Sequence, residues 1–164
     1  MRPTSVISLL RPHQWLKNLM LFFPPLLSGS LTQPHMFQRG IVPFIAFSMA
    51  ASATYVMNDL WDMDRDRVHP EKCRRPLPSG DMSKGEALVV FFTLLILAGT
   101  FAYHVSWRLM LFIGIYLVTS LLYSFTFKDW PIVDVFCISL GFILRLYAGG
   151  EAFDVFISDW LFLT

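Results

Sequence analysis

The chain has 164 residues, of which 55% are apolar and only 15% are charged. A soluble domain carries about 25% charged residues, and a soluble fold of this composition would expose large apolar patches to water. The composition therefore excludes an ordinary soluble domain, and its high apolar content excludes a disordered chain. The net charge of +1 gives no overall field that would attract nucleic acid. The class that fits is a membrane protein.

Five stretches are long and apolar enough to be membrane helices, because the bilayer core, about 30 Å thick, needs roughly 20 mostly apolar residues per helix. A further apolar run starts at Trp160 and reaches the last residue, Thr164. We therefore expect an all-α transmembrane bundle of five helices and the start of a sixth, as a single unit at the front of a longer protein. The predicted helices cover residues 15–33, 39–58, 86–105, 108–127 and 131–150.

The first stretch has two interpretations. A cationic flank followed by Ser28-Gly29-Ser30 is compatible with a cleaved signal peptide. However, Pro24 and Pro25 stand in the middle of the apolar run, and no A-x-A cleavage site follows them. We expect a retained first helix that is kinked at the proline pair, because proline removes backbone donors.

The distribution of cations predicts the orientation in the membrane. Ten of the 13 Lys and Arg residues lie before the first stretch or at its start, between the second and third stretches, or between the fourth and fifth. The opposite side has only Arg39 and Arg108, and Arg145 lies within the fifth stretch. Since cytoplasmic loops carry the excess of Lys and Arg, we expect the N-terminus and residues 61–84 on the cytoplasmic side of the cell (inner) membrane.

Residues 61–84 hold eleven of the 25 charged residues of the chain. A solvated loop is the simplest interpretation, but the order of the charges favours a site. Asp59, Asp62 and Asp66 are spaced by three and four residues, so a continuing helix would stack them on one face. Stacked carboxylates repel one another, and Mg²⁺ would reverse this by combining carboxylates with waters and substrate phosphate oxygens. We predict a Mg²⁺ site at these aspartates, with Asn58 beside it.

Cations follow the acidic helix end. The helix is expected to stop at His69-Pro70, because the residue before proline is pushed out of the helical region. Lys72 and Arg75 come directly afterwards. A metal ion together with Lys and Arg is a common clamp on a diphosphate, so this segment predicts a diphosphate site. A simple network of ion pairs is the alternative.

A second polar cluster, RPHQWLKN, covers residues 11–18 at the start of the first stretch. One interpretation is anchoring at the membrane interface, with Trp15 in the aromatic belt and the two cations at lipid headgroups. Anchoring does not require the two neighbouring amides, Gln14 and Asn18, which favour a hydrogen-bonding site. We therefore predict that Gln14, Lys17 and Asn18 form part of a substrate-binding site.

Three ionisable residues lie at or within the fifth stretch, where such groups are costly and usually mark a site or pathway. Lys128 and Asp134 are near its cytoplasmic end, and Arg145 is eleven residues deeper, about 16 Å along a helix, so Asp134 and Arg145 are not expected to pair. Arg145 either holds helices together through backbone carbonyls or contacts substrate. All three are candidate substrate-binding residues. Gly149-Gly150 predicts close helix packing or a helix end.

Other metal or redox sites are not predicted. Cys73 and Cys137 form no C-x-x-C pattern and are too few for a disulfide framework, and the four histidines share no ligand spacing.

The segment Asn58-Asp59-x-x-Asp62-x-x-x-Asp66 resembles the first aspartate-rich motif, NDxxDxxxD, of the UbiA superfamily of intramembrane prenyltransferases. Three further segments are similar to one branch of that family, the decaprenyl-phosphate phosphoribosyltransferases, and the likeness runs from about residue 9 to the end. These are residues 11–18, Arg67-x-His69-Pro70-x-Lys72-x-x-Arg75-Pro76, and Arg145-x-x-Ala148-Gly149-Gly150.

The resemblance implies nine transmembrane helices around a cavity that opens to the cytoplasm, with a second polar motif after the sixth helix, beyond Thr164. It also implies transfer of phosphoribose from phosphoribosyl diphosphate to a polyprenyl phosphate. Asp59, Asp62 and Asp66 would then hold Mg²⁺ on the leaving diphosphate, and Asn58 would assist them. An alternative is transfer of a prenyl group from a prenyl diphosphate to an aromatic acceptor. A membrane transporter or scaffold that merely binds cations would leave the ordered motif unexplained.

Overall fold

The computed structural model describes residues 3–127 and 130–157, and every regular element within these ranges is helical. Four long helices dominate it, and each is long and apolar enough to cross a membrane, the third together with the short helix that follows it. The expected all-α transmembrane bundle is thereby confirmed. The long helices are α3 (Met36–Trp61), α5 (Lys84–Val105), α6 (Trp107–Leu122) and α7 (Pro131–Phe153).

Shorter helical segments precede and connect the long helices. They are α1 (Pro3–Leu10), the 3₁₀ helix η1 (Pro12–Phe22), α2 (Phe23–Leu27), η2 (Ser30–Thr32), α4 (Met63–Arg67), η3 (Lys72–Arg74) and the π-helix η4 (Tyr123–Phe127). The run that begins at Trp160 lies outside the described residues, so the predicted sixth helix stays a prediction.

The first predicted helix, over 15–33, differs from the structure in both type and extent. It is a 3₁₀ helix followed by one short α-helix, and it ends at Leu27 because Gly29 takes a left-handed conformation with φ 71°. Pro24 and Pro25 lack the N–H groups that would continue the hydrogen-bond ladder. Because a 3₁₀ helix rises about 2.0 Å per residue, η1 and α2 together still extend about 30 Å, roughly the thickness of the bilayer core.

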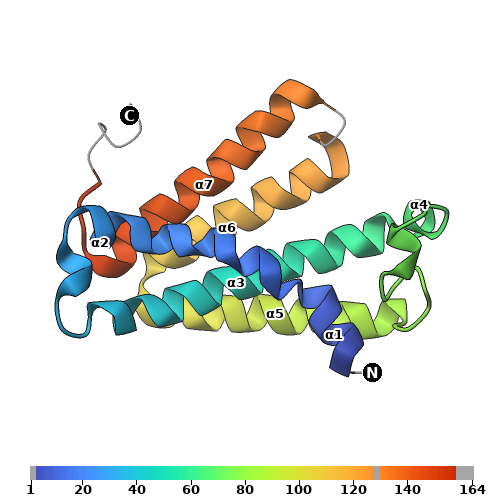
Figure 1. Ribbon diagram of the computed structural model, residues 1–164, viewed down its shortest axis with the longest axis horizontal. Helices are drawn as coiled ribbons and strands as arrows, with labels where there is room; N and C mark the ends of the chain where they lie inside the picture. Colours follow the sequence, from blue (N-terminus) through green and yellow to red (C-terminus); the bar gives the residue numbers. More distant parts are fainter. Residues whose placement is uncertain (1–2, 128–129, 158–164) are drawn as a thin grey trace.

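Helix α3 is the centre of the bundle. Figure 1 shows α3 and α5 side by side, with α6 and α7 forming a second antiparallel pair next to them. Small side chains along α3 are fully or almost fully buried, and small residues let neighbouring helices approach closely. These residues are Ala46, Ala50, Ala51 and Ala53.

The charged segment between α3 and α5 is folded onto the end of the bundle (Figure 1). Leu77 and Met82 are buried in one apolar cluster with Leu9 and Ala87, and the Met82 N–H donates to the Pro76 carbonyl at 3.0 Å. The segment is therefore anchored by apolar side chains and is more than a solvated loop.

The backbone of η1 passes very close to α7 at Gly149. A Cβ atom added there would overlap the carbonyl group of Leu21. The glycine pair thus permits close packing, as its sequence predicts, and Gly149 fixes the distance between η1 and α7. Helix α7 continues three residues past the predicted end at 150 and stops at Phe153, where Asp154 turns left-handed with φ 56°.

Candidate active site

The aspartates at the end of α3 lie on one continuous helical path. Helix α3 ends at Trp61, yet the Asp62 N–H donates to the Asn58 carbonyl at 2.9 Å and the Asp66 N–H donates to the Asp62 carbonyl at 2.8 Å. The ladder therefore runs through the junction between α3 and α4. Asp59 and Asp66 are buried, with 1% and 3% exposure, and Asn58 and Asp62 are half-buried beside them.

Arg75 joins the two buried carboxylates. Its Nη1 lies 3.1 Å from Asp59 Oδ1 and 2.6 Å from Asp66 Oδ2, and Lys72 Nζ lies 3.8 Å from Asp66 Oδ1. Two carboxylates about two helical turns apart thus converge on one cationic nitrogen. The expectation that Lys72 and Arg75 lie beside the acidic face is confirmed.

Arg11 is a further member of this cluster. Its Nη2 lies 2.5 Å from Asp59 Oδ1, and its guanidinium carbon lies 5.1 Å from the centre of the Tyr55 ring. Arg11 is therefore bound to a carboxylate of α3, a contact that the interpretation as a lipid-headgroup anchor does not include. Arg11 occupies the break between α1 and η1 with a left-handed φ of 51°, and this conformation is uncommon for a residue other than glycine.

The neighbouring residues of the 11–18 segment also bond to α3. The Trp15 Nε1–H donates to Ser52 Oγ at 2.9 Å, and the Tyr55 hydroxyl donates to Gln14 Oε1 at 3.4 Å. Trp15 is half-buried, so it is held by α3 and does not serve only as part of an aromatic belt. These bonds attach η1 to the face of α3 that leads to Asp59.

The donor atoms of this cluster fit a divalent cation of the Mg²⁺ type. The carboxylates of Asp59 and Asp66 and the half-buried side chains of Asn58 and Asp62 are hard oxygen donors, the kind that Mg²⁺ prefers. The carboxylates of Asp59 and Asp66 both contact one positively charged group, at Arg75 Nη1. Within the described residues, no three His, Cys, Asp or Glu side chains come together closely enough to hold a metal ion by themselves. A metal ion bound by Asp59 and Asp66 would therefore need further oxygen donors, such as waters or phosphate oxygens.

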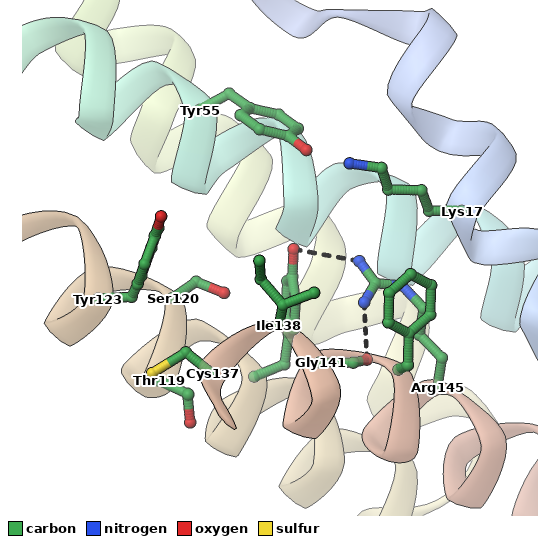
Figure 2. A pocket seen from close by; sticks show the side chains of 11 residues that line it. Lys17, Tyr55, Thr119, Ser120, Tyr123, Cys137, Ile138, Gly141 and Arg145 are labelled. Carbon is green, nitrogen blue, oxygen red and sulfur yellow. Dashed lines mark hydrogen bonds between the residues drawn. The ribbon is translucent and has the colours of Figure 1, made fainter. Parts of the chain in front are cut away.

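Asn18 and Arg145 bond to each other deep in the bundle. Asn18 is fully buried, its Nδ2 donates to Ser48 Oγ at 3.0 Å, and its Oδ1 accepts from Arg145 Nε at 2.8 Å. Lys17 is exposed and lines a pocket into which Arg145 also projects (Figure 2). The predicted residues thus fall into two groups, one around Asp59 and one around Arg145.

One candidate residue, Asp134, joins neither group. Asp134 lies in the first turn of α7, and its buried Oδ1 has no hydrogen-bond partner among the described residues. As expected, no hydrogen bond or ion pair links it to Arg145 within the described part of the chain. Lys128 lies outside the described residues.

Sequence reasoning missed a polar stripe on α3 that links the two groups. Ser48, Ser52, Tyr55 and Asp59 are spaced by four, three and four residues, which places them on one helix face. Each of the four side chains forms a hydrogen bond with a residue of the 11–18 segment. The signal was present in the sequence, because serine and tyrosine at helical spacing lead directly to the first aspartate. No comparable sequence pattern indicates that Tyr116 and Tyr123 line the pocket beside Arg145.

Comparison with protein families matches residues 21–164 to the UbiA prenyltransferase family. The chain belongs to the UbiA prenyltransferase family. The resemblance seen in the aspartate motif is thereby confirmed, and with its four apolar helices the UbiA chain is a multi-pass integral membrane protein.

Individual relatives agree with this assignment. The UbiA chain is 35% identical to the decaprenyl-phosphate phosphoribosyltransferase of Corynebacterium glutamicum, over 98% of this chain and 49% of the relative. It is 32% identical to the Mycobacterium tuberculosis enzyme of the same name, over 97% of this chain and 54% of the relative. The chain therefore spans about half the length of these relatives.

A solved structure matches the fold. A UbiA homolog from Archaeoglobus fulgidus, bound to GPP and Mg²⁺, superposes with a TM-score of 0.82 at 26% identity, over 97% of this chain and 57% of that one. The match extends over almost the whole chain, so it includes η1 and the segment between α3 and α5 as well as the four long helices.

Proposed function

We propose that this UbiA protein transfers 5-phosphoribose from phosphoribosyl diphosphate to a polyprenyl phosphate of the decaprenyl type and releases diphosphate. The observation that carries the proposal is the cluster of Asp59, Asp66 and Arg75. It lies in a chain that is 35% identical, over nearly its whole length, to an enzyme named for this transfer. Lys72 and Arg11 extend the same cluster.

The chemistry requires one bond to break and one to form. The bond between C1 of the ribose and the diphosphate oxygen breaks, and its electron pair leaves with the diphosphate. C1 develops positive charge, and an oxygen of the lipid phosphate supplies the electron pair of the new bond. Because the acceptor is already an anion, no general base is needed. This agrees with the composition of the cluster, which contains carboxylates and cations and no histidine.

The residues of the chain bind the donor and stabilise the leaving group. Arg75, Lys72 and Arg11 retain N–H groups beyond those bonded to Asp59 and Asp66, and such groups bind diphosphate oxygens strongly when both partners are charged. Charge that develops on the diphosphate meets cations that are already in place, so little reorganisation is required. The aspartates hold these cations at the C-terminal end of α3.

We also propose that the site works with Mg²⁺. Asp59, Asp62 and Asp66, with Asn58, would hold the ion against the donor, and the bound ion supplies Lewis-acid neutralisation of the departing diphosphate. The oxygen donors of the cluster support this assignment, and the A. fulgidus homolog is described with Mg²⁺.

The proposed location is the cell membrane, with the N-terminus and the 61–84 segment in the cytoplasm. Support comes from the cation count, because ten of the 13 Lys and Arg residues belong to that side. In this orientation, phosphoribosyl diphosphate would enter the site from the cytoplasm and the polyprenyl phosphate would enter it from the bilayer.

A second candidate function is transfer of a prenyl group from a prenyl diphosphate to an aromatic acceptor. The observation that favours it is the match to the A. fulgidus homolog bound to GPP. The same cluster would bind the diphosphate in either reaction, and the two functions differ in the group that leaves it.

The test is a product assay with the complete natural protein in detergent or nanodiscs. One reaction contains phosphoribosyl diphosphate labelled in the ribose together with decaprenyl phosphate. The other contains labelled geranyl diphosphate together with 4-hydroxybenzoate. Labelled lipid in the first reaction alone is the expected result. A labelled aromatic product in the second reaction alone would overturn the first proposal in favour of the second.

A further inference from the structure

A pocket between α6 and α7 contains two cations and no carboxylate. The Lys17 amine and the Arg145 guanidinium point into it from the same side (Figure 2), and the remaining lining residues of the described chain are uncharged. Five of them carry hydroxyl groups, of which those of Tyr55 and Thr119 already donate to Gln14 Oε1 and to the Ile115 carbonyl. These five are Tyr55, Tyr116, Thr119, Ser120 and Tyr123.

Arg145 is held in this pocket by neutral groups. It is 6% exposed, its Nη1 donates to the Gly141 carbonyl at 2.6 Å, and its Nη2 donates to the Tyr116 hydroxyl at 3.3 Å. With the bond from Nε to Asn18, three of its five N–H groups are used. The two remaining N–H groups, one on Nη1 and one on Nη2, border the pocket.

The charge of Arg145 has no carboxylate partner among the described residues, although it lies within a membrane-spanning helix. A charge in this position is costly unless it is paired, and such residues mark binding sites. Lys17 adds a second positive charge to the same space. An anion with two or more oxygen atoms would neutralise both cations, and the Tyr116 hydroxyl, which accepts from Arg145, retains its own proton for such an anion.

We propose that this pocket binds the phosphate group of the polyprenyl phosphate, as a subsite separate from the Asp59 cluster. The inference rests on the proposed function, and it assigns this pocket to the acceptor substrate of that reaction. Asn18 and Tyr116 are then positioning residues, because they orient the guanidinium of Arg145.

An apolar groove beside the pocket suits the prenyl chain of the same lipid. It runs along α6 from Thr119 to Trp107, and Thr119 also lines the pocket. Gly114 forms part of the groove, and a Cβ atom added there would meet nothing within 4 Å. This continuity favours a lipid phosphate over the soluble donor, whose phosphate groups are attached to a polar sugar.

The pocket lies next to the proposed donor site. Tyr55 lines the pocket and is one helical turn, about 6 Å, before Asp59 on α3. Arg11, which bonds to Asp59, covers the Tyr55 ring. Tyr123, on the opposite wall, belongs to the π-helix η4, a distortion that is frequent at functional sites. A phosphate held here would reach the donor from the membrane side.

The test measures binding of decaprenyl phosphate to the complete natural protein in phosphatidylcholine nanodiscs, without donor or metal ion. Decaprenol, which lacks the phosphate, is the matched ligand. Lys17→Gln is expected to weaken binding of the lipid phosphate at least tenfold and to leave decaprenol binding unchanged. Lys84→Gln, at the exposed start of α5 outside the pocket, is the control variant and is expected to change neither.

Three more variants separate the parts of the site. Arg145→Lys keeps the positive charge but loses the planar guanidinium and its paired N–H donors, so it is expected to weaken lipid phosphate binding several-fold. Gly114→Leu fills the groove, so it is expected to weaken binding of decaprenyl phosphate and to spare dimethylallyl phosphate. Asp66→Asn is expected to leave all lipid binding intact, and therefore a failure of the phosphoribosyl transfer assay would not by itself remove this subsite.

The proposal is overturned if Lys17→Gln and Arg145→Lys both retain full affinity for decaprenyl phosphate. It is also overturned if excess ribose 5-phosphate displaces the lipid, because the pocket would then belong to the donor. Equal loss of decaprenol and decaprenyl phosphate binding in Lys17→Gln would contradict phosphate recognition as well.

Discussion

Arg75 contacts both buried aspartates with one nitrogen atom, at 3.1 and 2.6 Å. Its neighbour Arg74 is exposed and makes no ion pair to a described residue. The two arginines are adjacent in the sequence and chemically identical, and they differ only in what they touch. Position within the cluster, and not net charge, should therefore decide their effects.

Replacing Arg75 with Gln should lower the free energy of unfolding by roughly 2 kcal/mol, because bonds to charged groups contribute about 1.5–3 kcal/mol. It should lower turnover at least ~100-fold if the guanidinium stabilises charge on the leaving group. Arg74→Gln should change both by little. Thermal unfolding in detergent and the product assay measure the two quantities. Equal loss of turnover in both variants would contradict the role assigned to Arg75.

The local part of the site was predictable from the sequence, and the long-range part was not. Asp59 and Asp66 share a helix, so their spacing predicts that they lie on one face, and Arg75 follows within nine residues. Arg11 is 48 residues from Asp59, and no local rule specifies that pair. The bond between Arg145 and Asn18 spans 127 residues and depends on the packing of η1 against α7.

At the scale of elements, η1 is the segment that connects the two halves of the site. It supplies Lys17 to the pocket, its Asn18 accepts a hydrogen bond from Arg145, and Trp15 bonds to Ser52 on α3. Its backbone lies directly against Gly149 of α7. Its apolar composition predicts a helix, but no side-chain periodicity specifies the 3₁₀ geometry that the structure shows.

Gly149→Ala should therefore be destabilising, because the new methyl group meets backbone atoms of Leu21 that cannot rotate away. We expect a loss of roughly 1–3 kcal/mol, the usual cost of overpacking, together with weaker lipid phosphate binding. Gly99→Ala is the matched control within α5, where an added Cβ meets nothing within 4 Å. It should be neutral or stabilise by up to about 1 kcal/mol. Thermal unfolding compares them, and an equal effect of both variants would contradict the close contact.

The segment between α3 and α5 shows a second limit of the sequence. Its charge predicts a site, but its position depends on Leu77 and Met82, which are 1% and 2% exposed. Two apolar residues in a charged loop have no periodicity that would indicate burial. They join the cluster around Leu9 because α1 packs across the same end of the bundle.

At the scale of the whole molecule, four of the five predicted membrane helices are the long helices of the structure, and these four followed from the apolar runs, because about 20 apolar residues are needed to cross a bilayer. The first stretch was the exception in length and helix type. The proposed orientation places the Asp59 cluster at the cytoplasmic surface and the Lys17–Arg145 pocket below it, within the membrane.

That orientation predicts the labelling of single cysteines in a protein in which Cys73 and Cys137 are replaced by Ser. Ser79→Cys, in the exposed part of the 61–84 segment, should react with a membrane-impermeant maleimide only after the cells are permeabilised. Gln33→Cys, exposed just before α3 at the other end of that helix, should react in intact cells. The reverse pattern would contradict the orientation.

The central claim is that the aspartates at the end of α3 form a Mg²⁺-dependent site for the donor diphosphate. Asp66 is buried and bonds to Arg75, whereas Asp64 is exposed and pairs only weakly with Arg67 on the surface. The decisive measurement is phosphoribosyl transfer to decaprenyl phosphate as a function of Mg²⁺ concentration. Asp66→Asn should lower turnover at least ~100-fold at every concentration, and Asp64→Asn should follow the unmodified protein within about twofold. Full Mg²⁺-dependent activity in Asp66→Asn, or activity of the unmodified protein that does not respond to Mg²⁺, would contradict the claim.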